Sequence, residues 1–266
     1  MAPGCTGSRR SELGARRDDS ARAGERPGAA SSRRPEASRT ATSRASCAPT
    51  GEWLHPWVST GHAPVLLFGD DSAKLLVTRY LSGTLVQGTS ARDDPETYRR
   101  AGSLLAAFHA QLSVVDEDWN SRFRARVERH LAQPHRIDPE IVRQIHAEIS
   151  GWPSGSALVV PTHGDWQPRN WLIDDGVVRV IDFGRADLRP PTEDFVRPAR
   201  QDFARQPGLE AAFFDGYGCD PREPAEWRRA LVGEAVGTAV WAYGVGDEWF
   251  EKFGHQLLAA LYGTQA

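Results

Sequence analysis

Residues 161–184 read PTHGDWQPRNWLIDDGVVRVIDFG, and this stretch decides the fold. Two apolar runs within it, Trp171–Ile173 and Val177–Ile181, flank a turn of sequence Asp-Asp-Gly at residues 174–176. β-Branched residues on both sides of an Asp-Gly turn predict a short β-hairpin. The residues just before the first strand and just after the second should therefore meet at the open end of the hairpin.

Three oxygen-bearing side chains fall at this open end. Asp165 and Asn170 lie in the loop before the first strand, and Asp182 ends the second. Carboxylate and amide oxygens suit a hard cation such as Mg²⁺, which proteins bind through one or two carboxylates together with substrate phosphates. The stretch therefore predicts a magnesium site built from residues that are far apart in the sequence.

The spacing of these residues is more informative than their chemistry. Asp165-x-x-x-x-Asn170, followed after a hairpin by Asp182-Phe183-Gly184, repeats the kinase order of catalytic Asp, Asn and Asp-Phe-Gly. Each short motif alone is commonly structural. Their joint occurrence, in order and across a hairpin of suitable length, favours a kinase-like fold. The opening His163-Gly164-Asp165 resembles the aminoglycoside phosphotransferase family and its small-molecule kinase relatives, among them choline and homoserine kinase-like enzymes.

This resemblance implies an α+β, protein-kinase-like fold with a mostly helical large lobe, a catalytic β-hairpin and a small β lobe. It also implies roles for individual residues. Asp165 would be the base that accepts the proton of the substrate hydroxyl, and Asn170 and Asp182 would hold Mg²⁺ against the phosphates of ATP (or GTP). His163 would support the catalytic loop without reacting.

Residues 1–50 differ in composition from the rest of the chain. They contain ten Arg and five Asp or Glu, and Leu13 is their only Leu, Ile, Val or Phe. Such a segment cannot bury enough apolar surface to offset its ordering entropy, so we expect a disordered head. Two alternatives are an Arg-rich tail that binds nucleic acid and a mis-set start or shifted reading frame.

Residues 51–88 are interpreted as a truncated small lobe and hinge. Two apolar runs, 64–68 and 75–81, are separated by a Gly-Asp-Asp turn and predict a pair of strands. An ordinary β-hairpin explains the same pattern. In the resembling family such a pair ends the small lobe, and Arg79, Tyr80 and Leu81 would form the hinge whose backbone holds the nucleotide base.

Residues 89–266 are expected to form the helical large lobe. Asp94-Pro95 and Asp138-Pro139 are good helix starts. The first of these helices has a stripe of Leu104, Leu105, Phe108 and Leu112, and a further helix has apolar residues at 119, 123, 127 and 131.

The later part of this lobe is also expected to be helical. Thr192 should cap a helix that Pro198 kinks or divides. Segments near 208–217, 223–244 and 247–262 follow, with Trp241 as a core residue. The resemblance places the substrate pocket among these last helices and makes Asp194 the match for an aspartate that supports the catalytic loop.

Charge and hydropathy narrow the choice of partners. The formal net charge is −3, and because residues 1–50 carry +5, residues 51–266 carry −8. An acidic folded part argues against nucleic acid as the main partner. No apolar run approaches the ~20 residues of a membrane helix, and the three cysteines lack metal-ligand spacing. These features are compatible with a cytoplasmic protein, and the resemblance implies that its partner is a small molecule with a hydroxyl group.

The resemblance misses the front of a kinase small lobe. That lobe needs a Gly-rich strand-turn-strand over the phosphates, a strand Lys on the α- and β-phosphates and a helix Glu that pairs with the Lys. The chain has only two lysines, and Lys74 lies on a turn just before the hinge, the wrong place for the phosphate Lys. Two hypotheses follow: a small-molecule phosphotransferase that acts on an alcohol group, and a non-catalytic kinase-like domain, a pseudoenzyme or truncated form, that binds a ligand or partner.

Overall fold

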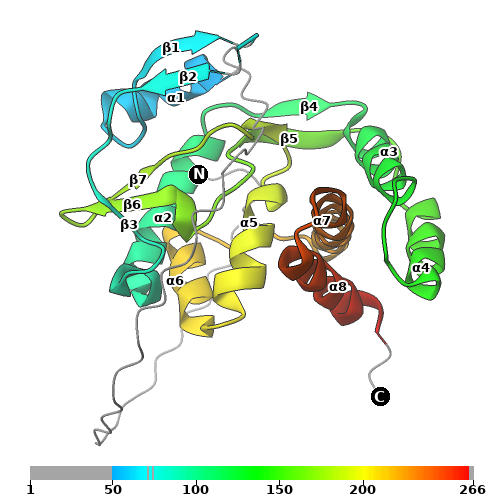
Figure 1. The fold of residues 1–266 in the computed structure, drawn as a ribbon. Coiled ribbons are helices and arrows are strands. Elements are labelled where there is room, and N and C mark those ends of the chain that lie inside the picture. The colour runs from blue at the N-terminus through cyan, green and yellow to red at the C-terminus, as the bar shows by residue number, and fades with distance from the viewer. Residues whose placement is uncertain (1–49, 71, 74, 264–266) are drawn as a thin grey trace, which may run out of the picture.

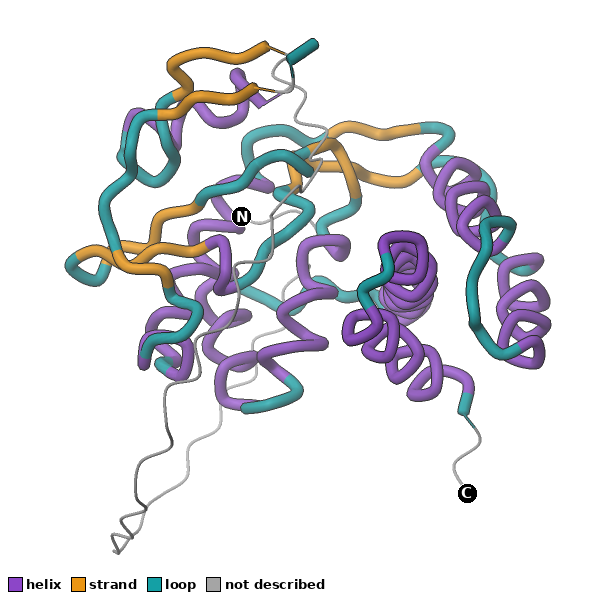
Figure 2. The backbone as a smooth tube through the Cα atoms, in the orientation of Figure 1, coloured by secondary structure: helices purple, strands orange, loops and turns teal. Residues whose placement is uncertain are grey.

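A computed structural model describes residues 50–70, 72–73 and 75–263 (Figure 1). The predicted head, residues 1–50, thus lies outside the described residues except for Thr50. The fold is α+β, as predicted, with short antiparallel sheets and a largely helical second half (Figure 2). No helix within the described ranges is long and apolar enough to cross a membrane. The described elements, in chain order, are α1 (Thr50–Ser59), β1 (Leu66–Asp70), β2 (Leu75–Thr78), β3 (Thr84–Leu85), η1 (Ser90–Asp93), α2 (Pro95–His109), β4 (Val114–Asp116), α3 (Trp119–Leu131), α4 (Pro139–Ser150), β5 (Ala157–Thr162), η2 (Pro168–Asn170), β6 (Trp171–Asp174), β7 (Val177–Val180), β8 (Asp187–Arg189), α5 (Thr192–Pro198), η3 (Ala199–Phe203), α6 (Pro207–Tyr217), α7 (Pro224–Val245) and α8 (Glu248–Tyr262).

The central hairpin forms as the sequence predicts. Strands β6 and β7 pair antiparallel, with Trp171 opposite Val180 and Asp174 opposite Val177. The turn between them has positive φ at both Asp175 (46°) and Gly176 (77°). Positive φ at both central residues is the geometry of the two-residue turn that Asp-Gly favours. The hairpin is extended on its other edge by β3, which pairs with β6.

A second sheet leads into the loop at residues 163–170. Strand β5 pairs with β4 on one edge and with β8 on the other, both antiparallel. Because Thr162 at the end of β5 lies opposite Asp187 at the start of β8, the residues after β5 and the residues before β8 come together. These are the His163-Gly164-Asp165 loop and the Asp182-Phe183-Gly184 segment.

Helices α2 and α6 pack unusually closely. A Cβ added to Gly102 of α2 would overlap the backbone carbonyl of Phe213, and one added to Gly216 of α6 would overlap the carbonyl of Arg99. Reciprocal glycines thus let the two backbones approach. Asp94 caps α2 by accepting from the N–H groups of Glu96 and Thr97, as the Asp-Pro start predicts.

The N-terminal part contains a helix that the sequence reasoning did not predict. Helix α1 has a proline within it, Pro56, and precedes the predicted strand pair β1–β2. Its Trp57 is buried and packs on Phe108 and Phe183, with ring centroids 4.4 and 5.9 Å apart. The β1–β2 pair is otherwise poorly covered, since all six of its large apolar side chains are exposed: Leu66, Leu67, Phe68, Leu75, Leu76 and Val77.

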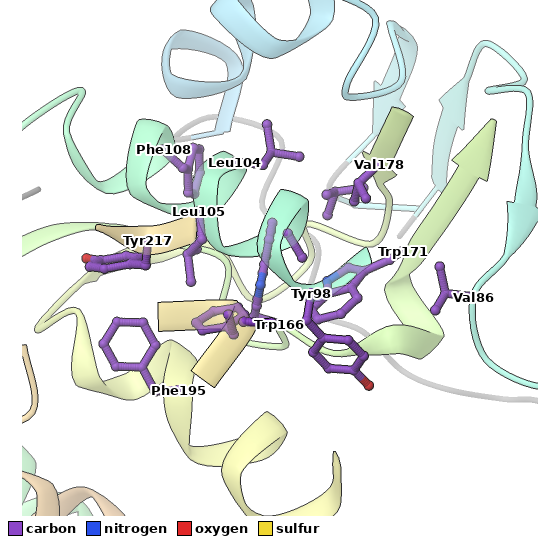
Figure 3. Packing of buried hydrophobic residues seen from close by; sticks show 14 of the residues in the cluster. Val86, Tyr98, Leu104, Leu105, Phe108, Trp166, Trp171, Val178, Phe195 and Tyr217 are labelled. Carbon is purple, nitrogen blue, oxygen red and sulfur yellow. The ribbon is translucent and has the colours of Figure 1, made fainter. Parts of the chain in front are cut away.

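Two apolar cores support these elements. The first surrounds the loop at residues 163–170, where Trp166 lies 5.6 Å from Trp171 between ring centroids; Figure 3 shows both rings in one cluster with Tyr98 and Leu105 of α2. Phe195 and Tyr217, on α5 and α6, meet on another side of the same cluster at a centroid distance of 5.1 Å. The second core joins α3 and α4 to α7 and α8 through residues such as Phe123, Ile145 and Val236.

Three expectations about single side chains are wrong. Leu112 lies beyond the end of α2 at His109 and is exposed, because the helix stops before the stripe is complete. Thr192 makes no capping bond, since its hydroxyl donates to Glu226 on α7. Trp241 is 53% exposed, since it is on the side of α7 that faces a cavity and not the core. Pro198 ends α5, and η3, one π-helical turn, follows as a division of the helix.

Candidate active site

The loop from His163 to Asn170 is held by a buried carboxylate. Asp194, at the start of α5, is 1% exposed. Its Oδ2 accepts from the backbone N–H of His163 (2.8 Å) and its Oδ1 from the N–H of Gly164 (2.6 Å). Burial alone would raise the pKa of Asp194, but the hydrogen bonds that it accepts from His109 and from the backbone N–H of His163 hold the pKa below its usual value. The loop entry is therefore fixed by an ionised group.

His109 connects this carboxylate to the helices behind it. Its Nε2 lies 3.1 Å from Asp194 Oδ2, and its Nδ1 lies 2.9 Å from the hydroxyl of Tyr217. Burial and the charge of Asp194 raise the pKa of Tyr217, so the phenol keeps its proton. A neutral imidazole with hydrogen on Nε2 satisfies both contacts, donating to Asp194 and accepting from Tyr217. Residues of α2, α5 and α6 thus form one buried chain of hydrogen bonds.

The glycine of the His-Gly-Asp motif has a steric cause. Gly164 has φ of +76°, in the left-handed region. A Cβ at this position would lie 2.5 Å from the carbonyl oxygen of Arg185. Only glycine fits where the loop passes so close to the residue after Asp182-Phe183-Gly184.

His163 is fully buried and bridges the two motifs. Its Nδ1 accepts from the backbone N–H of Asp165 (3.2 Å), so its Nε2 donates to the carbonyl of Ile181 (3.1 Å). Burial lowers its pKa, which keeps the ring neutral. The ring also lies 4.8 Å from that of Phe183, centroid to centroid. These contacts are those of a supporting residue between the loop and the hairpin end.

Asp165 lies at the centre of the loop and is 3% exposed. Its Oδ2 accepts from Arg169 Nη2 (2.8 Å) and from Asn170 Nδ2 (2.9 Å), and its Oδ1 accepts from Gln167 and Arg197. Burial would raise its pKa, yet the charges of Arg197 and Arg169 outweigh burial and keep the pKa well below the usual range. The carboxylate is therefore ionised and a weak proton acceptor.

Asn170 and Asp182 meet at the open end of the hairpin, where the backbone N–H of Ile181 donates to the carbonyl of Asn170 (3.0 Å). Because the Asn170 amide nitrogen bonds Asp165, its oxygen is the group left for a cation. Asp182 is exposed, with φ of +65°, and across the described ranges no hydrogen bond or ion pair engages its carboxylate. An unpartnered carboxylate beside an amide oxygen fits Mg²⁺ that shares its ligands with phosphates.

A metal cage made only of protein groups is not present in the part of the chain that the structure describes, which has no cluster of three His, Cys, Asp or Glu suited to a metal ion. Any cation at Asn170 and Asp182 would thus need further ligands from a bound phosphate compound or water. This is the usual mode for Mg²⁺ in phosphoryl-transfer sites.

The proposed hinge residues follow β2. Arg79 still belongs to the strand pair, since its N–H donates to the carbonyl of Val65 (2.8 Å). Tyr80 is 86% exposed, and within the described backbone the N–H groups of Tyr80 and Leu81 donate to no backbone carbonyl. Lys74 lies outside the described residues, and the second lysine, Lys252, is on α8.

A cavity of about 550 Å³ is lined by Gly164 and Arg169, on either side of Asp165 in the loop. This volume is typical of small-molecule sites. The loop and the segment after Asp182 form one wall, and α3, α5, α7 and the start of α8 form the other. The residues that line it include Gly164, Arg169, Arg185, Arg189, Arg197, Glu234, Trp241 and Phe250.

Sequence reasoning missed the arginines of this site. Arg169 and Arg185 stand within or next to the two motifs, and their positions were a usable signal. Arg197 gave no signal in the sequence, because it reaches Asp165 only through the packing of α5 against the loop. The exposed Trp241 was assigned to the core because its spacing on α7 equals that of buried neighbours.

A sequence model described as the phosphotransferase enzyme family matches residues 13–230, so the match begins within the segment before the first described residue. No curated protein matches the chain. Solved structures do. A choline/ethanolamine kinase family protein from Mesorhizobium loti has a TM-score of 0.58 at 17% identity, covering 78% of this chain and 76% of that one.

Two further structures have the same fold. Choline kinase LicA from Streptococcus pneumoniae has a TM-score of 0.57 at 14% identity and covers 78% of each chain. Aminoglycoside 2′-phosphotransferase-IIIa, solved as a GDP complex, has a TM-score of 0.54 at 15% identity, covering 78% of this chain and 79% of that one. At these identities the likeness concerns the fold, and the protein-kinase-like fold inferred from the motifs is confirmed.

Proposed function

The chain belongs to the phosphotransferase enzyme family, and we propose that it transfers the γ-phosphoryl group of ATP or GTP to a hydroxyl of a small molecule. The family and the kinase-like fold support phosphoryl transfer to a small molecule. The choice of nucleotide donor and hydroxyl acceptor rests on the residues of the catalytic loop.

One observation carries the proposal. The buried, ionised Asp165 is paired with Arg169 and Arg197, both of which line a cavity of small-molecule size, while Asn170 and the unpartnered Asp182 stand together at the hairpin end. A hydroxyl bound in the cavity would meet Asp165, and nucleotide phosphates would meet Asn170 and Asp182. In-line transfer between a nucleotide and an alcohol needs such an arrangement.

In the proposed reaction, the acceptor oxygen forms a bond to the γ-phosphorus while the bond from that phosphorus to the β–γ bridging oxygen breaks. The nucleoside diphosphate leaves, and the hydroxyl proton passes to Asp165 and then to water. Since the arginines keep the pKa of Asp165 low, its main task is to orient the hydroxyl, and the proton moves late. Bound Mg²⁺ would supply charge neutralisation at the phosphates.

The remaining assignments follow the same interpretation. Residues 51–88 would serve as small lobe and hinge, with the N–H groups of Tyr80 and Leu81 facing the base, and residues 89–266 as the large lobe. Asp194 and His163 would position the loop without touching the substrate. We place the reaction in the cytoplasm, where nucleotide and metabolite are both present.

The non-catalytic alternative also has an observation in its favour. Both oxygens of Asp165 are engaged by arginines, Arg197 on Oδ1 and Arg169 on Oδ2. If these contacts persist when ligand binds, no lone pair remains well placed for a substrate hydroxyl. The domain would then bind nucleotide without transferring phosphate.

Nucleotide binding and transfer are measured separately to decide between these functions. Calorimetry with ATP and with GTP, in Mg²⁺ and in EDTA, should show binding that needs Mg²⁺ and that Asp182→Ala abolishes. Asp187→Ala is the matched control, because Asp187 is an exposed carboxylate of β8 outside the proposed metal site. Binding that ignores both EDTA and Asp182→Ala would remove Asn170 and Asp182 from nucleotide recognition.

A further inference from the structure

The charged groups in the cavity wall are unequally paired. The wall contains three carboxylates, and each has a partner: Glu193 bonds Arg126, Glu234 bonds Arg197, and Asp247 accepts from the backbone N–H of Phe250. The acidic groups of the wall are thus already committed to contacts within the protein.

The wall also contains five arginines: Arg126, Arg169, Arg185, Arg189 and Arg197. Four of them form ion pairs with carboxylates. Besides the two pairs already named, Arg169 pairs with Asp165 and Arg189 pairs with Asp187. Arg185 is the exception. In the described part of the chain no hydrogen bond or ion pair engages its guanidinium.

Arg185 is held where an anion could reach it. Its carbonyl oxygen accepts from Arg189 Nη1 (2.8 Å), and its backbone passes against Gly164, so its position is fixed beside the catalytic loop. Protein atoms around its guanidinium, together with the charge of Arg197, lower its pKa. Because Arg185 is exposed, its guanidinium can form charge-assisted hydrogen bonds with an anion bound in the cavity.

The position of the cavity favours the acceptor over the nucleotide. Its far wall consists of α7 and α8 residues, including Thr238, Trp241 and Phe250, and no residue of β1, β2 or 79–81 lines it. Gly237 of α7 also lines the cavity. The space beside it is open enough that an added Cβ would make only an ordinary contact with His130, at 3.5 Å. The cavity therefore opens away from the hinge side of the loop.

We propose that the acceptor is an anionic alcohol, a small molecule that carries a carboxylate or phosphate group bound by Arg185 while its hydroxyl lies against Asp165. This inference rests on the proposed function for the hydroxyl and on the wall charges alone for the anion. It sets the chain apart from what the names of the choline kinases imply for those proteins, which is a cationic acceptor.

Binding without turnover tests the anion. Calorimetry on the full chain uses glycerate as the carboxylate probe, glycerol 3-phosphate as the phosphate probe, and glycerol, choline and kanamycin as neutral and cationic probes. We expect one or both anionic probes to bind and the others not to bind. Arg185→Gln should weaken the anionic probe about 10- to 100-fold, the range for loss of a charge-assisted hydrogen bond.

The matched control is Arg200→Gln. Arg200 also has no acceptor within the described ranges, and burial lowers its pKa, but it lies on η3 outside the cavity. It should leave anion binding unchanged, and Arg185→Lys should retain part of it. Circular dichroism establishes that each variant is folded.

The outcomes separate this inference from the proposed function. Anion binding that depends on Arg185, without phosphoryl transfer, supports the anion site and contradicts the transferase. Preferential binding of choline or kanamycin overturns the anion proposal and leaves the transferase standing. Loss of ATP affinity in Arg185→Gln, with anion binding intact, assigns Arg185 to the nucleotide and also overturns the proposal.

Discussion

Asp194→Asn is the most informative single change, because the isosteric amide keeps the shape and removes the charge. Asp194 accepts from three donors: the N–H groups of His163 and Gly164 and the Nε2 of His109. An amide has one oxygen and one NH₂ group. If the NH₂ takes the Oδ1 position it faces the N–H of Gly164, and if it takes the Oδ2 position it faces the N–H of His163.

At least one buried backbone N–H therefore loses its acceptor in either orientation. Leaving a buried donor unsatisfied costs about 1–3 kcal/mol, so we expect the free energy of unfolding to fall by about 2 kcal/mol. Asp194→Ala, which removes all three acceptor contacts, should cost more, roughly 3–5 kcal/mol, because several buried donors lose their acceptor at about 1–3 kcal/mol each. Activity should fall in both variants because the loop entry is no longer fixed.

Urea denaturation followed by tryptophan fluorescence measures the difference in free energy of unfolding between wild type and each variant. Asp215→Asn, which removes a charge from an exposed ion pair with Arg99, is the control and should change the stability little. The pKa of folded Asp194 lies below the ordinary value of an aspartate carboxyl group. Its contribution is thus complete above the unfolded pKa and is lost as the pH falls through the folded pKa. The gap between wild type and Asp194→Asn should be constant near neutral pH and shrink below about pH 4. A variant as stable as wild type at pH 7 would refute this account of the loop.

Three further changes test packing and the head. Gly164→Ala should lower the free energy of unfolding by about 2–4 kcal/mol and reduce activity, because of its positive φ and the clash with Arg185. Gly88→Ala, which has positive φ but open space around it, should cost less. Equal effects of the two variants in urea denaturation would exclude the clash. Gly102→Ala should destabilise the protein by about 1–3 kcal/mol by forcing α2 away from α6. Gly244→Ala on α7, which has open space around it, should be neutral or slightly stabilising. A neutral Gly102→Ala would mean that the two helices separate readily. Deletion of residues 1–49 should leave the thermal midpoint nearly unchanged, because their composition offers almost nothing to pack; a drop of several degrees would mean that the head contributes to the fold.

The local signals in the sequence were strong enough to predict most of the fold. The Asp-Gly turn and β-branched runs predicted β6–β7, and the two Asp-Pro starts predicted α2 and α4, because such signals act within a few residues. Helix α1 was missed since Pro56 lies inside it and its stabilising contact, Trp57 on Phe183, is long-range.

The site was predictable where a motif carries the geometry. The spacing of Asp165, Asn170 and Asp182 led to three residues that the hairpin brings to one end. The pairing of Arg197 with Asp165 and the exposure of Trp241 depend on how α5 and α7 pack against the loop. Tertiary packing of this kind leaves no periodic or local trace in a single sequence.

The central claim is phosphoryl transfer centred on Asp165, and label transfer from γ-³²P-ATP or γ-³²P-GTP tests it most directly. The full chain is incubated with Mg²⁺ and one hydroxyl compound at a time: glycerate, glycerol 3-phosphate, glycerol, choline or kanamycin. The enzyme concentration is kept close to that of the nucleotide, because turnover should be slow in a chain without the expected lysine on the phosphates. We expect a labelled organic product that requires Mg²⁺ and that falls by orders of magnitude in Asp165→Asn, while the nucleotide affinity of that variant stays unchanged. Bound nucleotide without any labelled product, or transfer that survives in Asp165→Asn, would contradict the account.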